Sequence, residues 1–405
     1  MIERTLYLDT WNELAPYRQM VFISGPRQAG KTTLTVQIRA RTVNSLYINW
    51  DEPEHRRLLI GNPHFYEEID RVDASKPVVA LDELHKYGDW KNYLKGIYDR
   101  DSHHFKFIVS GSGRLDAYRK GGDSLAGRYF LFYLWPFTLG ELADRRKKPE
   151  DFWQNPLDIP EEHGEDWDIW KTLDRLSGFP DPFTEGTQRY YRIWSRNYRS
   201  QLLRDELRDL AEIRKFTSAD LLYALLPERV GSPLSMHNLA GDIQVSSDTV
   251  KTWLAWFEQL FLSFRISPWS QRIPRAIRKE KKLYLYDYGS IESDGARLEN
   301  RVAVELLRAV QNWNDLGMGD YALHFLRNKQ GEEVDFLICD RNRPRLLIEV
   351  KTGETKPDTG LRKFQTILQI PAVQLVEKKG ICRLLSNGAH KIMVVSAPRY
   401  LSILP

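Results

Sequence analysis

The stretch FISGPRQAGKTTL, residues 22–34, constrains the fold more than any other part of the chain. The apolar run QMVFI before the first glycine contains β-branched residues, which is typical of a buried strand. The run KTTLTVQIRAR after the loop is typical of a helix. A buried strand, a glycine-containing loop and a helix in this order predict an α/β domain built on a parallel sheet.

The loop between that strand and helix has the form G-x-x-x-x-G-K-T, from Gly25 to Thr32. Its glycines let backbone N–H groups turn inward around phosphate oxygens, and the helix N-terminus adds the positive end of its dipole. In such a loop Lys31 reaches the β- and γ-phosphates, and the Thr32 hydroxyl binds Mg²⁺. We therefore predict a site for ATP and Mg²⁺, with a chance glycine-rich turn as the alternative. The residues assigned to the nucleotide are Gly25, Pro26, Arg27, Gln28, Ala29, Gly30, Lys31, Thr32 and Thr33.

A nucleotide loop of this kind needs a carboxylate on the Mg²⁺ side, at the end of another strand. The apolar run 78–81 shows no alternation, as expected of a strand in a parallel sheet, and Asp82 and Glu83 follow it. We expect Asp82 to hold Mg²⁺ through water and Glu83 to polarise the attacking water as a general base. A third strand, FKFIVSGSG at 105–113, ends in small polar residues, so Ser110 or Ser112 is expected to sense the γ-phosphate.

Four stretches together carry a family resemblance: GPRQAGKTTL, VVALDELHK, VSGSGRL and LAGRYFLFYLWPFTLGEL. They resemble the prokaryotic AAA+-type ATPases that have a DUF4143 region at the C-terminus, and the resemblance covers nearly the whole chain. It implies that Arg128, in the GR of the last stretch, stabilises phosphate charge in its own or a neighbouring subunit, and hence a possible homo-oligomer. A purely structural salt bridge is the alternative for Arg128.

The length of 405 residues suggests two or three domains at ~150 residues each. We expect an ATPase domain at 1–186, in which the acidic, tryptophan-rich stretch 150–185 is a lid or insertion. Residues 187–285 are predicted to be helical, with a winged helix whose second helix carries a single basic residue, Lys251. A winged helix that packs against protein therefore competes with one that reads DNA. A basic run follows and is expected to contact phosphates or to be a solvated loop: Arg272, Arg275, Arg278, Lys279, Lys281 and Lys282.

The last predicted domain, 286–405, contains a second chemical signature. Its pattern predicts strand, hairpin, strand, turn and strand, with Glu333 and Asp335 in EEVDFLI and Glu349 and Lys351 in IEVK. Residues i and i+2 of a strand face the same side, so Glu349 and Lys351 point together, and Asp335, near the end of a neighbouring strand, can converge with them. Asp335 and Glu349 would hold Mg²⁺, and Lys351 would orient or deprotonate a water for phosphodiester hydrolysis.

This pattern resembles the PD-(D/E)xK restriction-endonuclease-like nucleases, and Glu299 on the preceding helix matches a helix carboxylate found in some of them. Two alternatives stay open: a charged edge strand, and a nuclease-like fold that no longer cuts. The fold class predicted for the whole chain is α/β, with a P-loop AAA+-type sheet, a helical middle and a restriction-endonuclease-like tail.

The functional hypothesis is an ATPase that engages nucleic acid, with DNA favoured, and cleaves it with Mg²⁺ in the C-terminal domain. The alternative is a nucleotide-dependent switch that binds a protein partner. Net charge of +4 excludes a protein that binds nucleic acid by bulk charge, so any basic surface must be local. The two cysteines, Cys339 and Cys382, cannot form a disulfide framework, and no signal peptide or membrane span is expected, which favours the cytoplasm.

Overall fold

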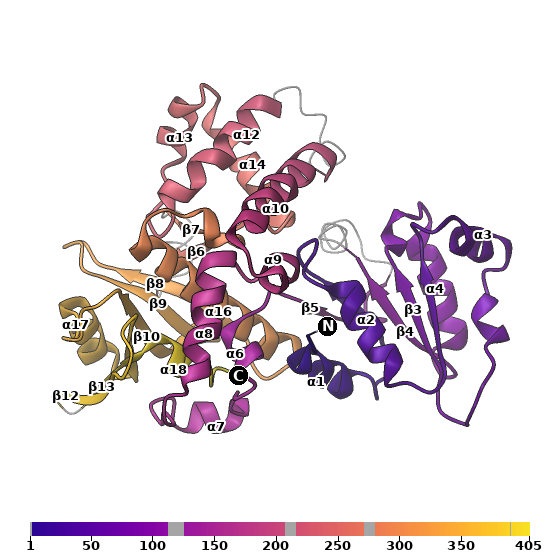
Figure 1. The fold of residues 1–405 in the computed structure, drawn as a ribbon, viewed down its shortest axis with the longest axis horizontal. Helices are drawn as coiled ribbons and strands as arrows, with labels where there is room; N and C mark the ends of the chain where they lie inside the picture. The colour runs from indigo at the N-terminus through magenta and orange to yellow at the C-terminus, as the bar shows by residue number, and fades with distance from the viewer. Residues whose placement is uncertain (1, 112–124, 207–215, 271–279, 389) are drawn as a thin grey trace. The chain divides into compact units, whose positions relative to one another are not determined.

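The computed structural model describes residues 2–111, 125–206, 216–270, 280–388 and 390–405. The chain divides into two compact units, Met1–Pro136 and Phe137–Pro405. Figure 1 labels their helices and strands. No helix in the described part of the chain has the length and apolar content that crossing a bilayer requires.

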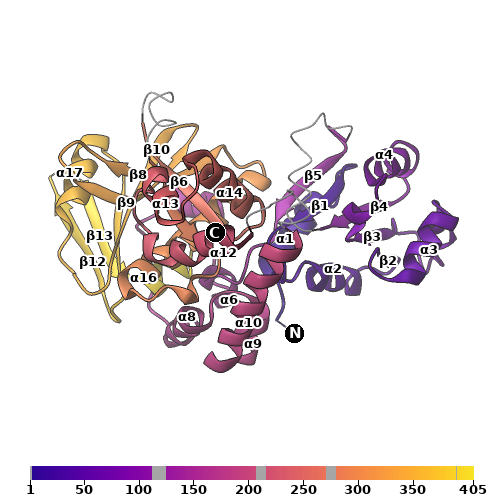
Figure 2. The same cartoon turned by 90° about the horizontal axis from the view of Figure 1, so that it is seen from above.

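The first unit is a parallel five-stranded sheet covered by helices on both faces. Its strand order is β2-β3-β4-β1-β5, and every neighbouring pair is parallel. Figure 2 shows the strands between α2 and α4. The strands are β1 Met20–Ser24, β2 Ser45–Asn49, β3 Val78–Asp82, β4 Lys106–Ser110 and β5 Tyr129–Tyr133. The helices are α1 Thr5–Leu14, α2 Lys31–Ala40, α3 Pro53–Gly61 and α4 Trp90–Asp101.

Side chains that alternate along these strands fill two separate cores. Val21 and Ile23 pack with residues of α1 and α2, whereas Met20 and Phe22 pack with residues of α4. Burial on both faces explains why the strands are continuous apolar runs in the sequence. The predicted P-loop α/β fold is confirmed.

The second unit is built on a mixed sheet with the order β12-β13-β11-β10-β9-β8-β6-β7. The long helix α16, Asp294–Asp315, buries one face among residues of this unit. A separate α/β domain with a mixed sheet at the C-terminus is also confirmed. The strands are β6 Ser263–Pro268, β7 Lys282–Leu285, β8 Tyr321–Arg327, β9 Glu333–Asp340, β10 Arg343–Lys351, β11 Ala372–Val376, β12 Cys382–Asn387 and β13 His390–Ser396. Two further helices are α17 Thr359–Leu368 and α18 Ala397–Leu401.

The segment expected to be a lid on the ATPase belongs to the second unit instead. Trp170 in this segment is almost fully buried, and its indole N–H donates to Glu377 at 3.0 Å. The guanidinium of Arg301 lies over the Trp170 ring, 3.5 Å from the ring centroid. Phe152 is also fully buried, against Trp313. Trp170 and Phe152 are thus core residues of the second unit, and the expected boundary at 186 differs from the observed one at 136–137. Its helices are α6 Leu139–Ala143, α7 Pro149–Gln154, α8 Gly164–Leu176 and α9 Pro180–Glu185.

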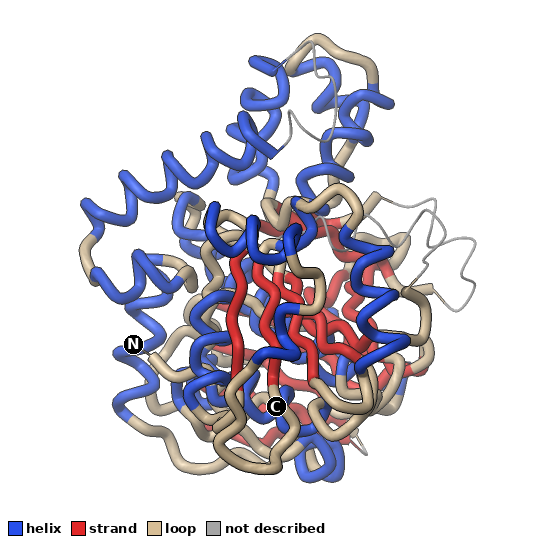
Figure 3. The backbone as a smooth tube through the Cα atoms, turned by 90° about the vertical axis from the view of Figure 1, so that its right-hand side faces the viewer, coloured by secondary structure: helices blue, strands red, loops and turns tan. Residues whose placement is uncertain are grey.

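The helices of the middle region lie together next to the β6–β7 edge of the large sheet (Figures 1 and 3). Ser235 and Ser246 cap the N-termini of the two short helices that sequence reasoning expected there. The strand expected as a wing, β6, pairs with both β7 and β8 and is therefore an inner strand of the large sheet. The helices are α10 Gln188–Gln201, α12 Phe216–Leu225, α13 Met236–Asp242 and α14 Ser247–Gln259.

Candidate functional site

The loop between β1 and α2 depends on glycine at its first position. Gly25 has a φ of 140°, and a Cβ there would lie 2.2 Å from the carbonyl oxygen of Leu134. The end of β5 therefore approaches the loop too closely for any side chain. Gly30, with a φ of 97°, is left-handed immediately before α2 begins at Lys31. The loop backbone can therefore wrap around the N-terminus of α2, as the sequence predicts.

The polar side chains around this loop converge on one carboxylate, Asp82, at the end of β3. Thr32 Oγ1 donates to Asp82 Oδ2 at 2.7 Å, and Ser110 Oγ donates to Oδ1 at 2.6 Å. Lys31 Nζ lies under the loop and donates to the carbonyls of Gly25 and Pro26 at 2.9 and 2.7 Å. The structure thus brings together the threonine, the aspartate and the serine that were predicted from three separate strand ends.

Tyr47 is a member of this site that sequence reasoning missed. Its hydroxyl donates to Asp82 Oδ2 at 2.9 Å, and burial together with the Asp82 charge raises the pKa of Tyr47 well above its usual value. Tyr47 lies in β2, next to β3 in a parallel register that pairs Asn49 with Asp82. Strand order would have been needed to find it, because no local motif marks the position.

Glu83 follows directly but engages a neighbouring lysine. Glu83 is left-handed, with a φ of 54°. Its Oε2 lies 3.0 Å from Lys86 Nζ and 3.7 Å from His85 Nε2. Lys86 also pairs with Asp51 Oδ2 at 2.6 Å. The predicted base is therefore at the correct edge of the sheet, held in an ion pair.

Arg128 lies at the opposite end of the sheet from the nucleotide loop. The register pairs Tyr129 with Met20, at the start of β1, whereas the loop follows the end of β1. Four residues of strand at about 3.3 Å each separate the two ends. Arg128 forms a two-pronged pair with Asp99, at 2.8 and 3.1 Å. The expectation that Arg128 contacts phosphate in its own subunit is therefore contradicted, and Ser112 lies outside the described residues.

The carboxylates of the second unit meet where β9 and β10 stop pairing through their backbones. The ladder continues to Ile348 opposite Phe336, so Glu349 stands opposite Asp335 at the next position. At this position the carboxylates of Asp335 and Glu349 accept hydrogen bonds from backbone N–H groups of the two strands. Asp335 N donates to Glu349 Oε2 at 3.3 Å, and Val350 N donates to Asp335 Oδ2 at 3.0 Å. Asp335 and Glu349 therefore converge on one side of the sheet edge, as their spacing predicts.

Two lysines neutralise this carboxylate cluster, and the sequence indicated only one. Lys351 Nζ pairs with Glu349 Oε1 at 2.7 Å and with Asp358 at 3.3 Å. Lys282, read from the sequence as part of a basic surface run, is almost fully buried in β7. Its Nζ lies within 3.4 Å of three carboxylates, at 3.0, 2.5 and 3.4 Å from Glu299, Glu333 and Asp335 respectively. Arg272, Arg275, Arg278 and Lys279 lie outside the described residues.

Burial and mutual repulsion perturb the acids of this cluster. Burial first, and then the charge of Asp335, raises the pKa of Glu349 to about 8. The same two causes raise the pKa of Glu299 to about 7, although Lys282 and the hydroxyl of Tyr284 both bond to it. A cation beside Asp335 and Glu349 would relieve this repulsion, so the oxygen donors present there fit a Mg²⁺ ion.

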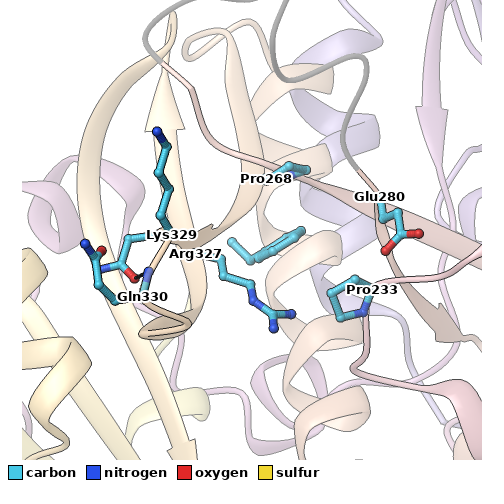
Figure 4. Close-up of a pocket in the computed structure, with 8 residues that line it drawn as sticks. Pro233, Pro268, Glu280, Arg327, Lys329 and Gln330 are labelled. Carbon is cyan, nitrogen blue, oxygen red and sulfur yellow. Dashed lines mark hydrogen bonds between the residues drawn. The ribbon is translucent and has the colours of Figure 1, made fainter.

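A pocket of about 640 Å³ opens beside this cluster (Figure 4). Arg327 and Lys329 line it together with one carboxylate, Glu280, and with apolar Phe325, Pro233 and Pro268. Arg327 Nε lies 3.7 Å from Glu333, and the Phe325 ring lies 5.5 Å from Lys282 Nζ. The pocket therefore combines cationic donors with an apolar wall, next to the carboxylates.

A third acidic group lies in the first unit. His64, Glu67 and Asp101 bring their ligand atoms within 4.8 Å of one another. Arg100, however, pairs with both Glu67 and Asp101, and Tyr66 donates to Asp101 at 2.6 Å. These pairs already satisfy the carboxylates, so we assign no metal to this group.

Known domain families match separate parts of the chain. A model of an AAA domain matches residues 17–143, a domain of unknown function (DUF8612) matches 173–293, and the domain of unknown function DUF4143 matches 294–399. The uncharacterized proteins Mb2031c of Mycobacterium bovis and Rv2008c of Mycobacterium tuberculosis are each 20% identical over 368 residues, which cover 88% of this chain and 76% of theirs.

Two solved structures are similar at lower identity. A Walker-type ATPase of Pyrococcus abyssi is 14% identical with a TM-score of 0.43, over 71% of this chain and 94% of its own. AMPPCP-bound DnaA from Aquifex aeolicus is 15% identical with a TM-score of 0.28, over 63% of this chain and 86% of its own. The match to an AAA domain and the parallel order of the five-stranded sheet both indicate a P-loop ATPase fold. The chain therefore combines an AAA-type P-loop ATPase domain with a C-terminal DUF4143 domain.

Proposed function

We propose that the first unit binds ATP with Mg²⁺ and hydrolyses it. The observation that carries this proposal is the convergence of Thr32 and Ser110 on Asp82, beside a loop whose first position only glycine can occupy. A Mg²⁺ ion bound by Thr32 and Asp82 would neutralise charge on the phosphates. Lys31, already inside the loop, would exchange its two carbonyl acceptors for phosphate oxygens. The backbone N–H groups at the start of α2 would add to this binding.

Glu83 is proposed as the base that orients the attacking water. It immediately follows Asp82, so it lies at the same sheet edge as the loop. To act on water its carboxylate must part from Lys86, whose second partner, Asp51, can retain the ammonium group.

Lys31→Ala should abolish nucleotide binding, measured with a fluorescent ATP analogue. Binding equal to that of the unmodified protein would reject this assignment of the pocket.

Arg128 is proposed to act on the nucleotide of a neighbouring subunit in a homo-oligomer. Its position just before β5 is far from its own loop, and its side chain is about one quarter exposed, at 26%. To reach a neighbour it must leave Asp99. Mixing Arg128→Ala protein with Lys31→Ala protein should restore part of the ATP turnover that each lacks alone. Full turnover by Arg128→Ala alone would leave the pair with Asp99 as a structural contact.

We further propose that the second unit is a Mg²⁺-dependent phosphodiesterase acting on nucleic acid, with DNA as the favoured substrate. The supporting observation is the convergence of Asp335 and Glu349 at the point where the β9–β10 ladder opens. A bound Mg²⁺ would polarise the phosphate and lower the pKa of a water. Lys351, half-buried beside Glu349, would orient that water and offset negative charge that develops on the phosphate.

The order of elements supports this assignment, because α16 is followed by three antiparallel strands, then α17 and the parallel strand β11. These are the helix and strands on which the sequence resemblance places Glu299, Asp335 and Glu349. The basic side of the neighbouring pocket, Arg327 and Lys329, suits a phosphate backbone. The free cysteines Cys339 and Cys382 suit a reducing compartment, so we place the protein in the cytoplasm.

One observation favours a second candidate, a nucleotide-driven switch whose C-terminal domain binds a protein partner without cutting. Lys282 and Lys351 already neutralise much of the carboxylate charge. One experiment separates the two candidates: cleavage of duplex DNA, single-stranded DNA and RNA in Mg²⁺ or Mn²⁺, with ATP turnover measured alongside. Cleavage that Asp335→Asn abolishes supports the phosphodiesterase. ATP turnover without cleavage of any substrate supports the switch.

A further inference from the structure

The helix α10, Gln188–Gln201, has one face made of arginines. They are spaced by three, four and three residues, so at 3.6 residues per turn they fall within an arc of about 80°. Three of them are exposed and the last is half-buried. The residues of this arginine face are Arg189, Arg192, Arg196 and Arg199.

The opposite face of α10 fixes how these arginines point. Tyr191, Trp194 and Tyr198 are buried, and the rings of Trp194 and Tyr198 stack at 4.8 Å. The Tyr191 hydroxyl donates to Asp287 at 2.8 Å, and Ser195 donates to the same carboxylate at 2.5 Å. A helix anchored by three aromatic side chains and two hydrogen bonds cannot turn about its axis. The arginines are therefore held toward solvent.

The C-terminal end of the arginine face borders a hollow of about 620 Å³. Arg196, Arg199 and Arg204 line it, and the hydroxyls of Ser200 and Thr217 add hydrogen-bond donors. Asp220 also lines it, and its carboxylate lies 3.6 Å from Arg199 Nε. Three guanidinium groups around one hollow outnumber this carboxylate and leave a positive site.

Within the part of the chain that the structure describes, most of this charge has no counter-ion. Among the described residues, Arg189, Arg192, Arg196 and Arg204 take part in no ion pair, whereas Arg199 pairs with Asp220. Since the whole chain carries a net charge of only +4, this is a strong local excess. Like charges three and four residues apart on a helix are destabilising, so the isolated helix gains nothing from them.

We propose that the arginine face of α10 and the adjoining hollow bind the phosphate backbone of nucleic acid, without reading its sequence. This inference rests on the proposed action on nucleic acid and names the surface that holds the substrate. From Arg189 to Arg199 the helix rises about 15 Å, which spans about four phosphates of one strand. Arginine binds phosphate through two parallel N–H donors, which a flexible lysine cannot do. An acidic protein is less well matched, because its carboxylates are not spaced as a regular polyanion.

The test measures how salt weakens binding to a fluorescent 20-base-pair duplex between 50 and 200 mM salt, by anisotropy in EDTA so that nothing is cut. The variant is Arg189→Gln, Arg192→Gln and Arg196→Gln combined. Each lost phosphate contact reduces the slope of log affinity against log salt by about 0.9, so the triple variant should lose about 2.7. A matched control removes three exposed charges elsewhere in the same unit: Lys171→Gln, Arg175→Gln and Arg343→Gln. The control should keep the original slope.

An unchanged slope in the arginine variant, or an equal fall in the control, overturns the proposal. So does loss of retention on poly-glutamate with DNA binding intact, which would indicate an acidic protein partner. A fall in ATP turnover measured without nucleic acid, at unchanged DNA affinity, would assign the arginines to the ATPase instead. Cleavage in Mg²⁺ is measured separately. If DNA binds through the arginine face but is never cut, only the phosphodiesterase proposal is refuted. If DNA is cut but the salt slope of the arginine variant is unchanged, only the proposal for the arginine face is refuted.

Discussion

The two candidate sites use carboxylates in opposite ways. At the nucleotide loop one aspartate, Asp82, accepts hydrogen bonds from neutral hydroxyls, and the glycines of the loop leave backbone groups to bind the ligand. In the second unit, acids from α16, β9 and β10 gather and are neutralised by lysines. The phosphate loop of the first site is therefore made mainly of backbone and is local in sequence, although the hydroxyls around Asp82 come from other strands. The second is made of side chains and depends on strand register and burial.

We call the carboxylate cluster of the second unit the side-chain site and the nucleotide loop the backbone site. The largest effect should come from a substitution that disrupts the side-chain site and leaves the backbone site unchanged. Asp335→Asn keeps the shape of the side chain but removes the charge that a Mg²⁺ ion requires, so cleavage should fall to background. ATP turnover should remain near that of the unmodified protein, because the nucleotide loop lies in the other unit. Cleavage of a labelled oligonucleotide and phosphate release measure the two. Asp340→Asn, at the other end of β9, is the control, and residual cleavage by Asp335→Asn equal to the control would refute the role.

The converse change tests the backbone site. Glu83→Gln should lower ATP turnover by about 10²–10⁴-fold, the usual contribution of a general base, while ATP still binds. Phosphate release and equilibrium binding of an ATP analogue measure the two quantities. Glu67→Gln, an exposed acid of the same unit, should change neither. Turnover that survives Glu83→Gln would mean that Glu83 belongs to its ion pair with Lys86 alone.

Lys282 tests a difference in stability between the two sites. We expect only the second site to need a buried cation to stay folded. Lys282→Met leaves Glu299, Glu333 and Asp335 without their shared partner, and removing one member of a buried pair costs about 3–5 kcal/mol of unfolding free energy. Urea unfolding measures it. The neighbouring Lys281→Met should cost little. If Lys282→Met proved as stable as the Lys281→Met control, the buried ion pairs would not contribute as described.

The smallest expected effect is a pH dependence confined to the side-chain site. Glu349 has its pKa raised from 4.5 to about 8, chiefly by burial, so the folded state binds more protons than the unfolded state between these values. Glu349 should therefore make stability fall as pH rises from 5 to 8, by at most about 1.4 kcal/mol per pH unit, and Glu299, whose pKa is raised to about 7, adds to the fall below pH 7. Urea unfolding at a series of pH values measures the slope. Glu349→Gln should make the slope shallower, most clearly between pH 7 and 8, and the exposed Glu354→Gln should not; equal slopes in both variants would contradict the assignment.

The same contrast explains what the sequence could predict. The loop, Asp82 and Ser110 were found because a glycine pattern and the ends of apolar strands are local signals. Glu349 and Lys351 were found together because i and i+2 residues of a strand share a face, and Asp335 because it lies near the end of a neighbouring strand. Lys282 was read as surface charge, since nothing local distinguishes a buried lysine from the five basic residues around it. Arg128 was misplaced because its position depends on the direction of β5 relative to the loop, and the tryptophans of 150–185 do not reveal which core they enter.

The buried ammonium group of Lys282 has a practical consequence. In many metal sites the ion is the counter-charge that lets the ligands fold together, so a chelator unfolds the domain. Here the chain supplies that counter-charge itself, from β7, to acids on α16 and β9. Protein purified in EDTA should therefore stay folded, with its carboxylates already gathered, and adding a divalent ion should change what the domain can do without changing whether it is folded.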